Sequence, residues 1–197
     1  MYKASACYDW AMRVIAGQFR SRPLVAPLGQ DTRPTSDRLR ETLFNVLAPQ
    51  ISDSVFLDLY AGSGAVGIEA LSRGANEVIF VEKAEPALRA IRANLSSLSI
   101  HGGYTLETRS VAAALKRLAS SERAADIIFL DPPYSGAAEY ESTLNLLGSE
   151  CRPLLSTGAI VIAEHLKKLN LADSYGALHR YRTLKQGDSI LSFYSLS

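Results

Sequence analysis

The stretch LDLYAGSGAVG, Leu57 to Gly67, joins an apolar run to a turn that contains three glycines. These glycines follow the G-x-G-x-x-G spacing of a nucleotide-binding turn between a strand and a helix. Gly62 and Gly64 can accept positive φ and let the backbone approach a ligand, and Gly67 permits close packing of the helix on the strand. The stretch therefore predicts a cofactor-binding loop at the carboxyl end of a strand.

Strands and helices alternate from this loop onward. Strands are expected over 55–60, 77–83, 104–110, 125–131 and 158–165, and helices over 65–73, 85–98, 111–120 and near 139–150. This alternation is typical of a parallel sheet with helices on both faces. The last two runs, 179–187 and 189–196, have no convincing helix between them, and Gly187-Asp188 is a hairpin signal. The sequence therefore predicts an α/β, Rossmann-like fold with a seven-stranded, mostly parallel sheet that ends in an antiparallel C-terminal hairpin.

The segment before the sheet is expected to form a small extension. RVIAG and PLVAP, within residues 12–27, predict a β-hairpin, and Ser36 can cap a helix over 37–48. Arg38 and Arg40 fall outside the apolar stripe of this helix and are expected to face solvent or a ligand. The chain thus divides into an appendage over 1–11 without an assigned role, an extension over 12–50 and a cofactor-binding domain over 51–197.

The charge of the chain is unevenly distributed. Residues 13–40 carry six arginines, no lysine and two aspartates, a net charge of +4 in a chain whose total is +1. A basic segment on a near-neutral body indicates a face that meets a polyanion, because the guanidinium fork suits phosphate oxygens. A solvated arginine-rich surface is the alternative.

Other features argue against a membrane protein and a metal site. No apolar run approaches the ~20 residues that span a bilayer. The two cysteines show no metal or redox spacing, and the three histidines are scattered. We therefore expect a reduced, cytoplasmic protein without a metal, and a structural role for His165 at a strand end.

Two acidic residues bear on which cofactor the loop holds. Glu82 ends the second predicted strand, 20 residues after Gly62, and suits the ribose hydroxyls of either a nicotinamide dinucleotide or S-adenosylmethionine. Asp58 favours S-adenosylmethionine, because a carboxylate is unfavourable beside a pyrophosphate and favourable beside an ammonium and a sulfonium. The alternative is that Asp58 only caps the turn.

IIFLDPPY, Ile127 to Tyr134, is the most specific motif in the chain. An apolar strand delivers Asp131 to the same edge of the sheet as the glycine loop, and two prolines stiffen the following turn. An exocyclic base amine is a poor nucleophile, because its lone pair is delocalised into the ring. The Asp131 side chain and the Pro132 carbonyl can accept hydrogen bonds from this amine and favour the geometry that frees the lone pair. Tyr134 offers a surface for an unstacked base.

Three separated motifs resemble the RsmD family: RVIAGQFRSRPLVAP, TRPTSDRLRETLFNVL and LDLYAGSGAVGIEALSRGA. That family consists of class I S-adenosylmethionine-dependent methyltransferases that methylate N2 of one guanine in bacterial 16S rRNA. D-P-P-Y after the fourth strand is an amino-methyltransferase signature. The resemblance runs from about Met12 to the carboxyl terminus. It implies the class I methyltransferase fold, S-adenosylmethionine as cofactor, and 16S rRNA in an assembled or assembling small ribosomal subunit as partner; a monomer is the default expectation.

The motifs and the resemblance together give three sets of candidate residues. The catalytic set is Asp131, Pro132, Pro133 and Tyr134. The cofactor-binding set is Asp58, Tyr60, Ala61, Gly62, Ser63, Gly64, Glu82, Lys83, Ser110, Val111 and Asp131. The RNA-binding set is Arg20, Arg22, Arg33, Pro34, Thr35 and Arg38. One position departs from the family, which usually carries an aspartate after the third strand to contact the adenine amine; this chain has Ser110 there.

Three alternatives stay open. D-P-P-Y also occurs in DNA and RNA adenine-N6 methyltransferases, although the chain has no room for a separate DNA-recognition domain. The Ser110 departure would also suit an rRNA-binding assembly protein without catalysis. A dehydrogenase is disfavoured, because hydride transfer does not require a D-P-P-Y motif.

Overall fold

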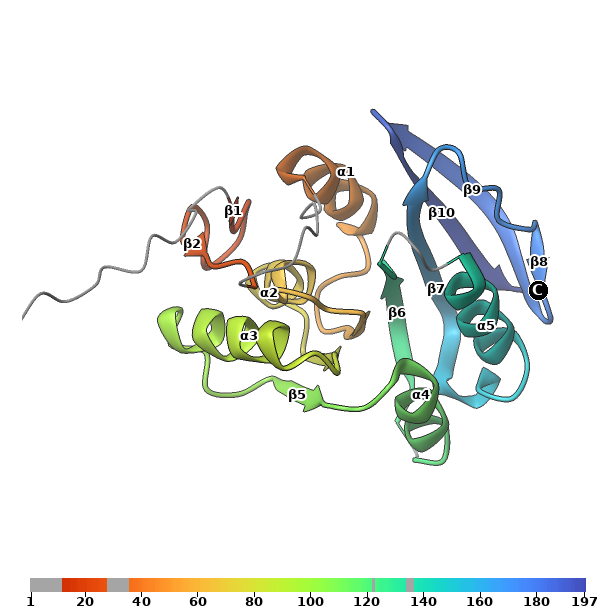
Figure 1. Ribbon diagram of the computed structural model, residues 1–197, viewed down its shortest axis with the longest axis horizontal. Helices are drawn as coiled ribbons and strands as arrows, with labels where there is room; N and C mark the ends of the chain where they lie inside the picture. Colours follow the sequence, from red (N-terminus) through yellow and green to blue (C-terminus); the bar gives the residue numbers. More distant parts are fainter. Residues whose placement is uncertain (1–11, 28–35, 122, 134–136) are drawn as a thin grey trace, which may run out of the picture.

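The computed structural model describes residues 12–27, 36–121, 123–133 and 137–197. Among these residues the main sheet has eight strands, in the order β5-β4-β3-β6-β7-β10-β9-β8 (Figure 1). Five of them run parallel: β3 (Val55–Leu59), β4 (Glu77–Val81), β5 (Tyr104–Glu107), β6 (Ala125–Leu130) and β7 (Leu155–Leu166). Three antiparallel strands complete the sheet: β10 (Ser189–Leu196), β9 (Leu178–Gln186) and β8 (Ser174–Tyr175).

Helices cover both faces of this sheet. One apolar core contains residues of α1 (Asp37–Leu47), α2 (Ala65–Ser72) and α3 (Glu85–Ser97). The core on the other face contains residues of α4 (Val111–Ala119) and α5 (Ala137–Gly148). A short 3-10 helix, Arg152–Leu154, leads into β7.

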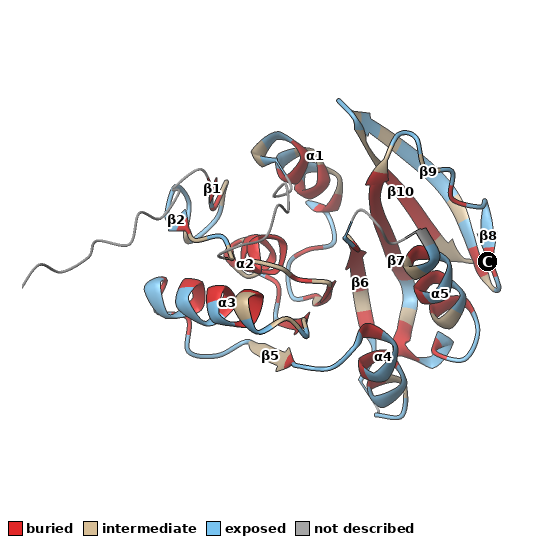
Figure 2. Ribbon diagram, viewed as in Figure 1, coloured by how far each residue is buried: buried red, intermediate tan, exposed pale blue. Residues whose placement is uncertain are grey.

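The two cores follow from the alternation of side chains along each strand. Phe56 of β3 packs in one core with Phe80 and Phe129 of the neighbouring strands, whereas Leu57 packs in the other core with Ile79. Strands that are buried on both faces need continuous apolar sequence, which is the pattern of VFLDL and ADIIFL. Figure 2 shows that β6 and β7 are mostly buried and that the middle of β10 is buried, whereas β9 is largely exposed.

The predicted α/β fold with its antiparallel C-terminal hairpin is confirmed, and the expected bounds hold to within three residues at each end. One detail was wrong: the main sheet has eight strands, not seven. The additional strand is β8, which consists of two residues that pair with the start of β9. So short a strand has no periodic pattern of its own.

The predicted N-terminal hairpin is present, with a shorter ladder than the sequence suggests. β1 (Met12–Arg13) pairs antiparallel with β2 (Pro23–Leu24). Val14 still donates across the hairpin to the Arg22 carbonyl, at 3.0 Å. The following two N–H groups bond to α2 instead: Ile15 and Ala16 donate to the Glu69 carboxylate, at 2.7 and 3.0 Å. The hairpin is therefore docked on the helix that follows the glycine loop.

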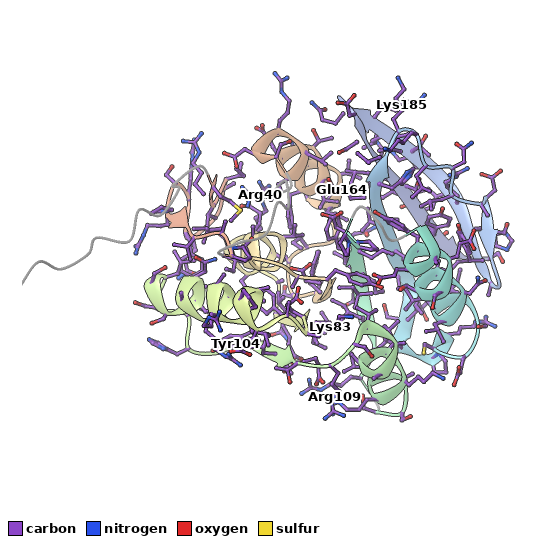
Figure 3. All side chains as sticks on the ribbon, in the orientation of Figure 1. Arg40, Lys83, Tyr104, Arg109, Glu164 and Lys185 are labelled. Atoms are coloured by element: carbon purple, nitrogen blue, oxygen red, sulfur yellow. The ribbon has the colours of Figure 1, made fainter. Side chains whose placement is uncertain are left out.

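Helix α1 begins as expected but buries one arginine that was expected outside. The Ser36 hydroxyl accepts the Leu39 N–H at 3.3 Å, and Arg38 is exposed. The expectation for Arg40 was wrong, because this side chain is fully buried between α1 and the N-terminal hairpin (Figure 3). It donates to the Arg13 carbonyl at 2.7 Å and to Asp37 at 2.6 Å. The periodicity of apolar residues shows which face of a helix packs on the core, but it cannot show that another segment covers part of the polar face.

Candidate functional site

A cavity of about 730 Å³ lies at the carboxyl ends of the parallel strands. β3 is flanked by β4 on one side and β6 on the other, so the direction of winding reverses there. Such a switch point is where open α/β sheets bind ligands. The cavity volume is in the range of small-molecule sites. Every predicted cofactor-binding residue except Gly64 lines this cavity.

The glycine loop turns through three residues with positive φ. These are Tyr60 (φ 60°), Gly62 (φ 57°) and Gly64 (φ 77°). Gly64 is buried at the N-cap of α2, and its N–H donates to the Ala61 carbonyl at 2.7 Å. Gly64 thus shapes the loop, while its neighbours form the cavity wall. A tyrosine in the left-handed region costs roughly 1 kcal/mol or more, and such strain is common at ligand sites.

Gly67 packs α2 against β4, as the sequence predicted. A Cβ at this position would lie 2.3 Å from the Phe80 ring and 2.8 Å from a Val78 methyl. Its N–H donates to the Asp58 carboxylate at 2.9 Å. Because Gly67 has no side chain, the start of α2 can lie close to β4, and its N–H can reach Asp58 of β3.

Asp58 is buried, and it lines the cavity. Burial raises the pKa of its carboxyl group to about 8; the Gly67 N–H opposes this shift, and the nearby Glu82 charge adds to it. The group is consequently mostly protonated at neutral pH when the cavity holds no cation. A cation in the cavity would favour the carboxylate, because an opposite charge lowers the pKa of an acid.

Glu82 is fixed by backbone donors on both of its oxygens. One oxygen accepts the Gly62 N–H at 3.0 Å, and the other accepts the N–H groups of Lys83 and Ala84, each at 2.8 Å. A carboxylate offers about four acceptor sites. Glu82 therefore joins the glycine loop to the end of β4 and can still accept hydroxyl groups from the cavity.

Ser110 caps α4 at the edge of the cavity. Its hydroxyl accepts the Ala113 N–H at 3.4 Å, and Val111 is the first residue of the helix. The hydroxyl hydrogen stays available as a donor. The serine thus caps the helix as well as an aspartate would. It lacks the second carboxylate oxygen that an aspartate could offer to the adenine amine.

The predicted catalytic turn follows β6 directly. Asp131, Pro132 and Pro133 line the cavity; Asp131 is half-buried, and Pro132 is buried. Tyr134 lies outside the described residues. The turn is therefore on the same wall as the end of the glycine loop, as expected from two neighbouring parallel strands.

Sequence reasoning missed several cavity residues. Thr143 and Glu139 of α5 line the wall beside Tyr60, and the Tyr60 hydroxyl lies 2.9 Å from the Thr143 hydroxyl. Burial raises the pKa of Tyr60; the hydrogen bond with Thr143 opposes this shift, and Glu139 adds to it. The N-terminal segment adds Met12, Ala26 and Pro27, and the end of β5 leads to Arg109, which Figure 3 shows beside the start of α4.

The predicted RNA-binding arginines that the structure describes are exposed. These are Arg20, Arg22 and Arg38. Arg22 donates to the Ser97 carbonyl at 3.0 Å, at the end of α3 remote from the cavity. Because a helix of this length spans about 20 Å, Arg22 lies far from the cavity. Arg33, Pro34 and Thr35 lie outside the described residues.

His165 is buried and does not line the cavity. Its ring nitrogens lie 3.1 Å from the Leu166 carbonyl and 2.9 Å from the Ser192 hydroxyl, and burial lowers its pKa. These contacts are those of a structural histidine. Cys151 is a buried free thiol. Within the described ranges, no three His, Cys, Asp or Glu side chains group as metal ligands, and no helix is long and apolar enough to cross a bilayer.

Residues 12–195 match the model of the family described as "Conserved hypothetical protein 95". The chain belongs to this family. It is 34% identical over 183 residues, 93% of this chain and 98% of the relative, to "Putative rRNA methyltransferase YlbH" of Bacillus subtilis. It is 40% identical over 136 residues to "Ribosomal RNA small subunit methyltransferase D" of Escherichia coli, covering 69% of this chain and 66% of the relative.

A solved structure agrees with these relatives. "Putative methyltransferase yhhF from Escherichia coli" has a TM-score of 0.80 and 33% identity, with 94% of this chain and 98% of that chain covered. The predicted resemblance to the RsmD family and the methyltransferase fold are both confirmed. The protein is an enzyme of a methyltransferase family.

Proposed function

We propose that the protein transfers a methyl group from S-adenosylmethionine to the exocyclic N2 amine of one guanine in 16S rRNA. The observation that carries this proposal is a single cavity that the glycine loop, Glu82 and the Asp131-Pro132 turn all line. The rRNA substrate is supported by relatives that are named as small-subunit rRNA methyltransferases.

The described residues fit the cofactor. The Glu82 carboxylate is oriented for ribose hydroxyls, and Ser110 and Val111 form the wall at the start of α4 for the adenine ring. Asp58 and the glycine loop face the methionine end, where a buried acid can become charged against an ammonium. When bound, S-adenosylmethionine supplies an electrophilic methyl group on a sulfonium.

Asp131 and Pro132 bind the exocyclic amine of the guanine. The Asp131 carboxylate and the Pro132 carbonyl accept the two N–H groups of the amine, so its lone pair is less engaged with the ring. Pro133 stiffens the turn, since its φ is held near −65°. Tyr134, which follows, supplies a surface on which the extruded base stacks. Holding the amine in line for attack provides much of the remaining rate.

The extension over residues 12–50 is the RNA-facing part. Arg20, Arg22 and Arg38 are exposed and are available to phosphates, and Arg33, Pro34 and Thr35 are assigned near the target nucleotide. The substrate is the small subunit or an assembly intermediate of it, in the cytoplasm. The enzyme acts as a monomer and without a metal.

Methyl transfer by Asp131→Ala tests the proposal. We expect loss of tritiated methyl transfer to small ribosomal subunits, with S-adenosylhomocysteine binding retained by calorimetry. Asp188→Ala, which removes an exposed aspartate at the β9–β10 turn, serves as the control and should turn over normally. Unchanged turnover in Asp131→Ala would overturn the role of the turn.

Mass mapping of rRNA from cells with and without the protein tests the substrate. One N2-methylguanine in 16S rRNA should disappear when the protein is absent. Methylation of duplex DNA in place of subunits would identify an adenine-N6 enzyme instead. A failure of the wild type to bind S-adenosylhomocysteine would indicate an assembly protein without catalysis.

A further inference from the structure

The side chain of Asn94 joins two segments that are far apart in the sequence. Asn94 lies on α3 and is 1% exposed. Its Oδ1 accepts the Val25 N–H at 2.7 Å, and its Nδ2 donates to the Val25 carbonyl at 3.0 Å. The same Nδ2 donates to the Ser63 carbonyl at 2.9 Å. A buried amide with every polar atom bonded holds its partners in one arrangement, because releasing any of them leaves an unsatisfied group.

One partner of Asn94 lines the cavity, and the other directly precedes two residues that do. Ser63 lies between the two glycines that turn the loop, and it lines the cavity. Val25 is followed by Ala26 and Pro27, which also line the cavity. A second contact joins the loop to the N-terminal segment, because the Ser63 hydroxyl lies 3.6 Å from the Met12 sulfur.

The rest of the N-terminal segment, residues 12–27, is anchored to α2 and not to the loop. The Ser72 hydroxyl accepts the Phe19 N–H at 3.0 Å and donates to the Ala16 carbonyl at 2.5 Å. Gly17 lies so close to α2 that a Cβ there would be 1.8 Å from the Ser72 carbonyl oxygen. The segment therefore has anchors on the body of α2 and two links to the cofactor loop, the hydrogen-bonded bridge through Asn94 and the longer contact between Met12 and Ser63.

We propose that Asn94 is a positioning residue that couples the cofactor loop to the N-terminal segment, so that cofactor binding and rRNA binding favour each other. The part that concerns rRNA rests on the function proposed above. A cofactor that fixes Ser63 also fixes Val25 through the shared amide, and the segment that carries Arg20 and Arg22 is then held in place. Coupling of this kind is reciprocal: rRNA that holds the segment must tighten cofactor binding by the same factor.

Two substitutions at Asn94 and one control at Ser72 test the coupling. Asn94→Ala removes all three bonds, whereas Asn94→Asp keeps the size of the side chain and its acceptor and loses both donated bonds. Ser72→Ala removes two of the bonds that hold the segment on α2, those of the Ser72 hydroxyl, without touching the loop. We expect the Kd for S-adenosylhomocysteine, measured by calorimetry, to rise about 5-fold or more in both Asn94 variants and less than about 2-fold in Ser72→Ala.

Hydrogen exchange supplies a readout that does not depend on a ligand. In the free protein, the amides of residues 61–64 should exchange faster in Asn94→Asp than in the wild type, while those of residues 69–72 should not change. Near-wild-type melting by circular dichroism would show that the variant is folded. Exchange in 61–64 that matches the wild type would overturn the bridge.

Binding to small ribosomal subunits tests the second part of the proposal, the coupling between cofactor binding and rRNA binding. Wild-type protein should bind subunits several-fold more tightly with S-adenosylhomocysteine than without it, and this ratio should fall to about one in Asn94→Asp. Normal cofactor affinity in both Asn94 variants, or an equal loss in Ser72→Ala, would overturn the positioning role. If the wild type binds no subunits while the Asn94 effect on the cofactor persists, the proposed substrate fails and the positioning role stands.

Discussion

The Glu69 carboxylate accepts the backbone N–H of Ile15 at 2.7 Å, although the two residues are 54 positions apart in the chain. Glu69 is fully buried on α2, and it also accepts the Ala16 N–H and the Arg73 guanidinium, at 3.0 and 2.6 Å. A buried carboxylate is tolerated only when its oxygens are bonded, and here the N-terminal segment supplies two of the donors. The segment is thus part of the folded body, and through Met12, Ala26 and Pro27 it completes the cavity wall.

Glu69→Gln should destabilise the protein by about 3 kcal/mol, measured by urea unfolding. The amide turns one acceptor into a donor that faces an N–H group, and it leaves Arg73 without its ion pair. Protease cleavage within residues 13–22 should become faster. Glu85→Gln is the control, since Glu85 is exposed and pairs with Arg92 at 3.5 Å; its effect should stay within about 0.5 kcal/mol. Equal effects of the two substitutions would contradict the anchoring role of Glu69.

Gly67→Ala should destabilise the protein by about 1–3 kcal/mol, because the new methyl group overlaps the buried Phe80 ring at 2.3 Å. The preference of helices for alanine, up to about 1 kcal/mol, offsets only part of this cost. Displacement of α2 should also weaken S-adenosylhomocysteine binding, since the helix begins at the glycine loop. Gly102→Ala meets no atom within 4 Å and should leave both quantities unchanged. A Gly67→Ala protein as stable as the wild type would show that α2 has room to move.

Most of the sheet could be predicted because its strands are buried on both faces. ADIIFL over 125–130 is apolar enough to be a central strand, and the turn after it breaks the pattern sharply. β8 could not be predicted, because two residues gain their strand conformation only from pairing with β9. The burial of Arg40 could not be predicted either, because it depends on contact with the N-terminal hairpin, a separate segment of the chain.

The candidate site was predictable where residues follow strand ends and not where other elements complete it. Glu82 and Asp131 follow parallel strands, and such strands end at one edge of the sheet. Glu139 and Thr143 could have been found, because they lie four positions apart near the start of the helix after D-P-P-Y and so share one helix face. No sequence signal marks Pro27, whose place on the wall depends on how the N-terminal segment docks.

The raised pKa of Asp58 gives the stability of the protein a definite pH dependence. In the unfolded chain this group loses its proton near pH 4, whereas burial raises its pKa in the folded protein to about 8. Between these two values the folded state holds a proton that the unfolded state has released. The contribution of Asp58 to the free energy of unfolding therefore falls as pH rises through this window.

Asp58→Asn should remove that contribution. Urea unfolding of both proteins at several pH values from about 5 to about 8 gives a difference in which the titrating groups that do not interact with Asp58 cancel. The wild type should lose stability relative to the variant as pH rises, because the asparagine side chain has no proton to release. A difference that does not change with pH would mean that the Asp58 carboxyl titrates at its ordinary value.

Substitutions at Ser110 separate its cap from its contact with the cofactor. Ser110→Ala removes the hydroxyl that accepts the Ala113 N–H and should cost about 1 kcal/mol of stability. Ser110→Asp keeps a cap, places a negative charge at the start of α4 and adds an acceptor on the cavity wall. One added hydrogen bond of about 1 kcal/mol to the adenine amine should lower the Kd for S-adenosylhomocysteine about 5-fold. Ser120→Asp, at the other end of α4 and away from the cavity, should leave that Kd unchanged. Binding by Ser110→Asp that is no tighter than that of the wild type would mean that the adenine amine is recognised by another group on the wall.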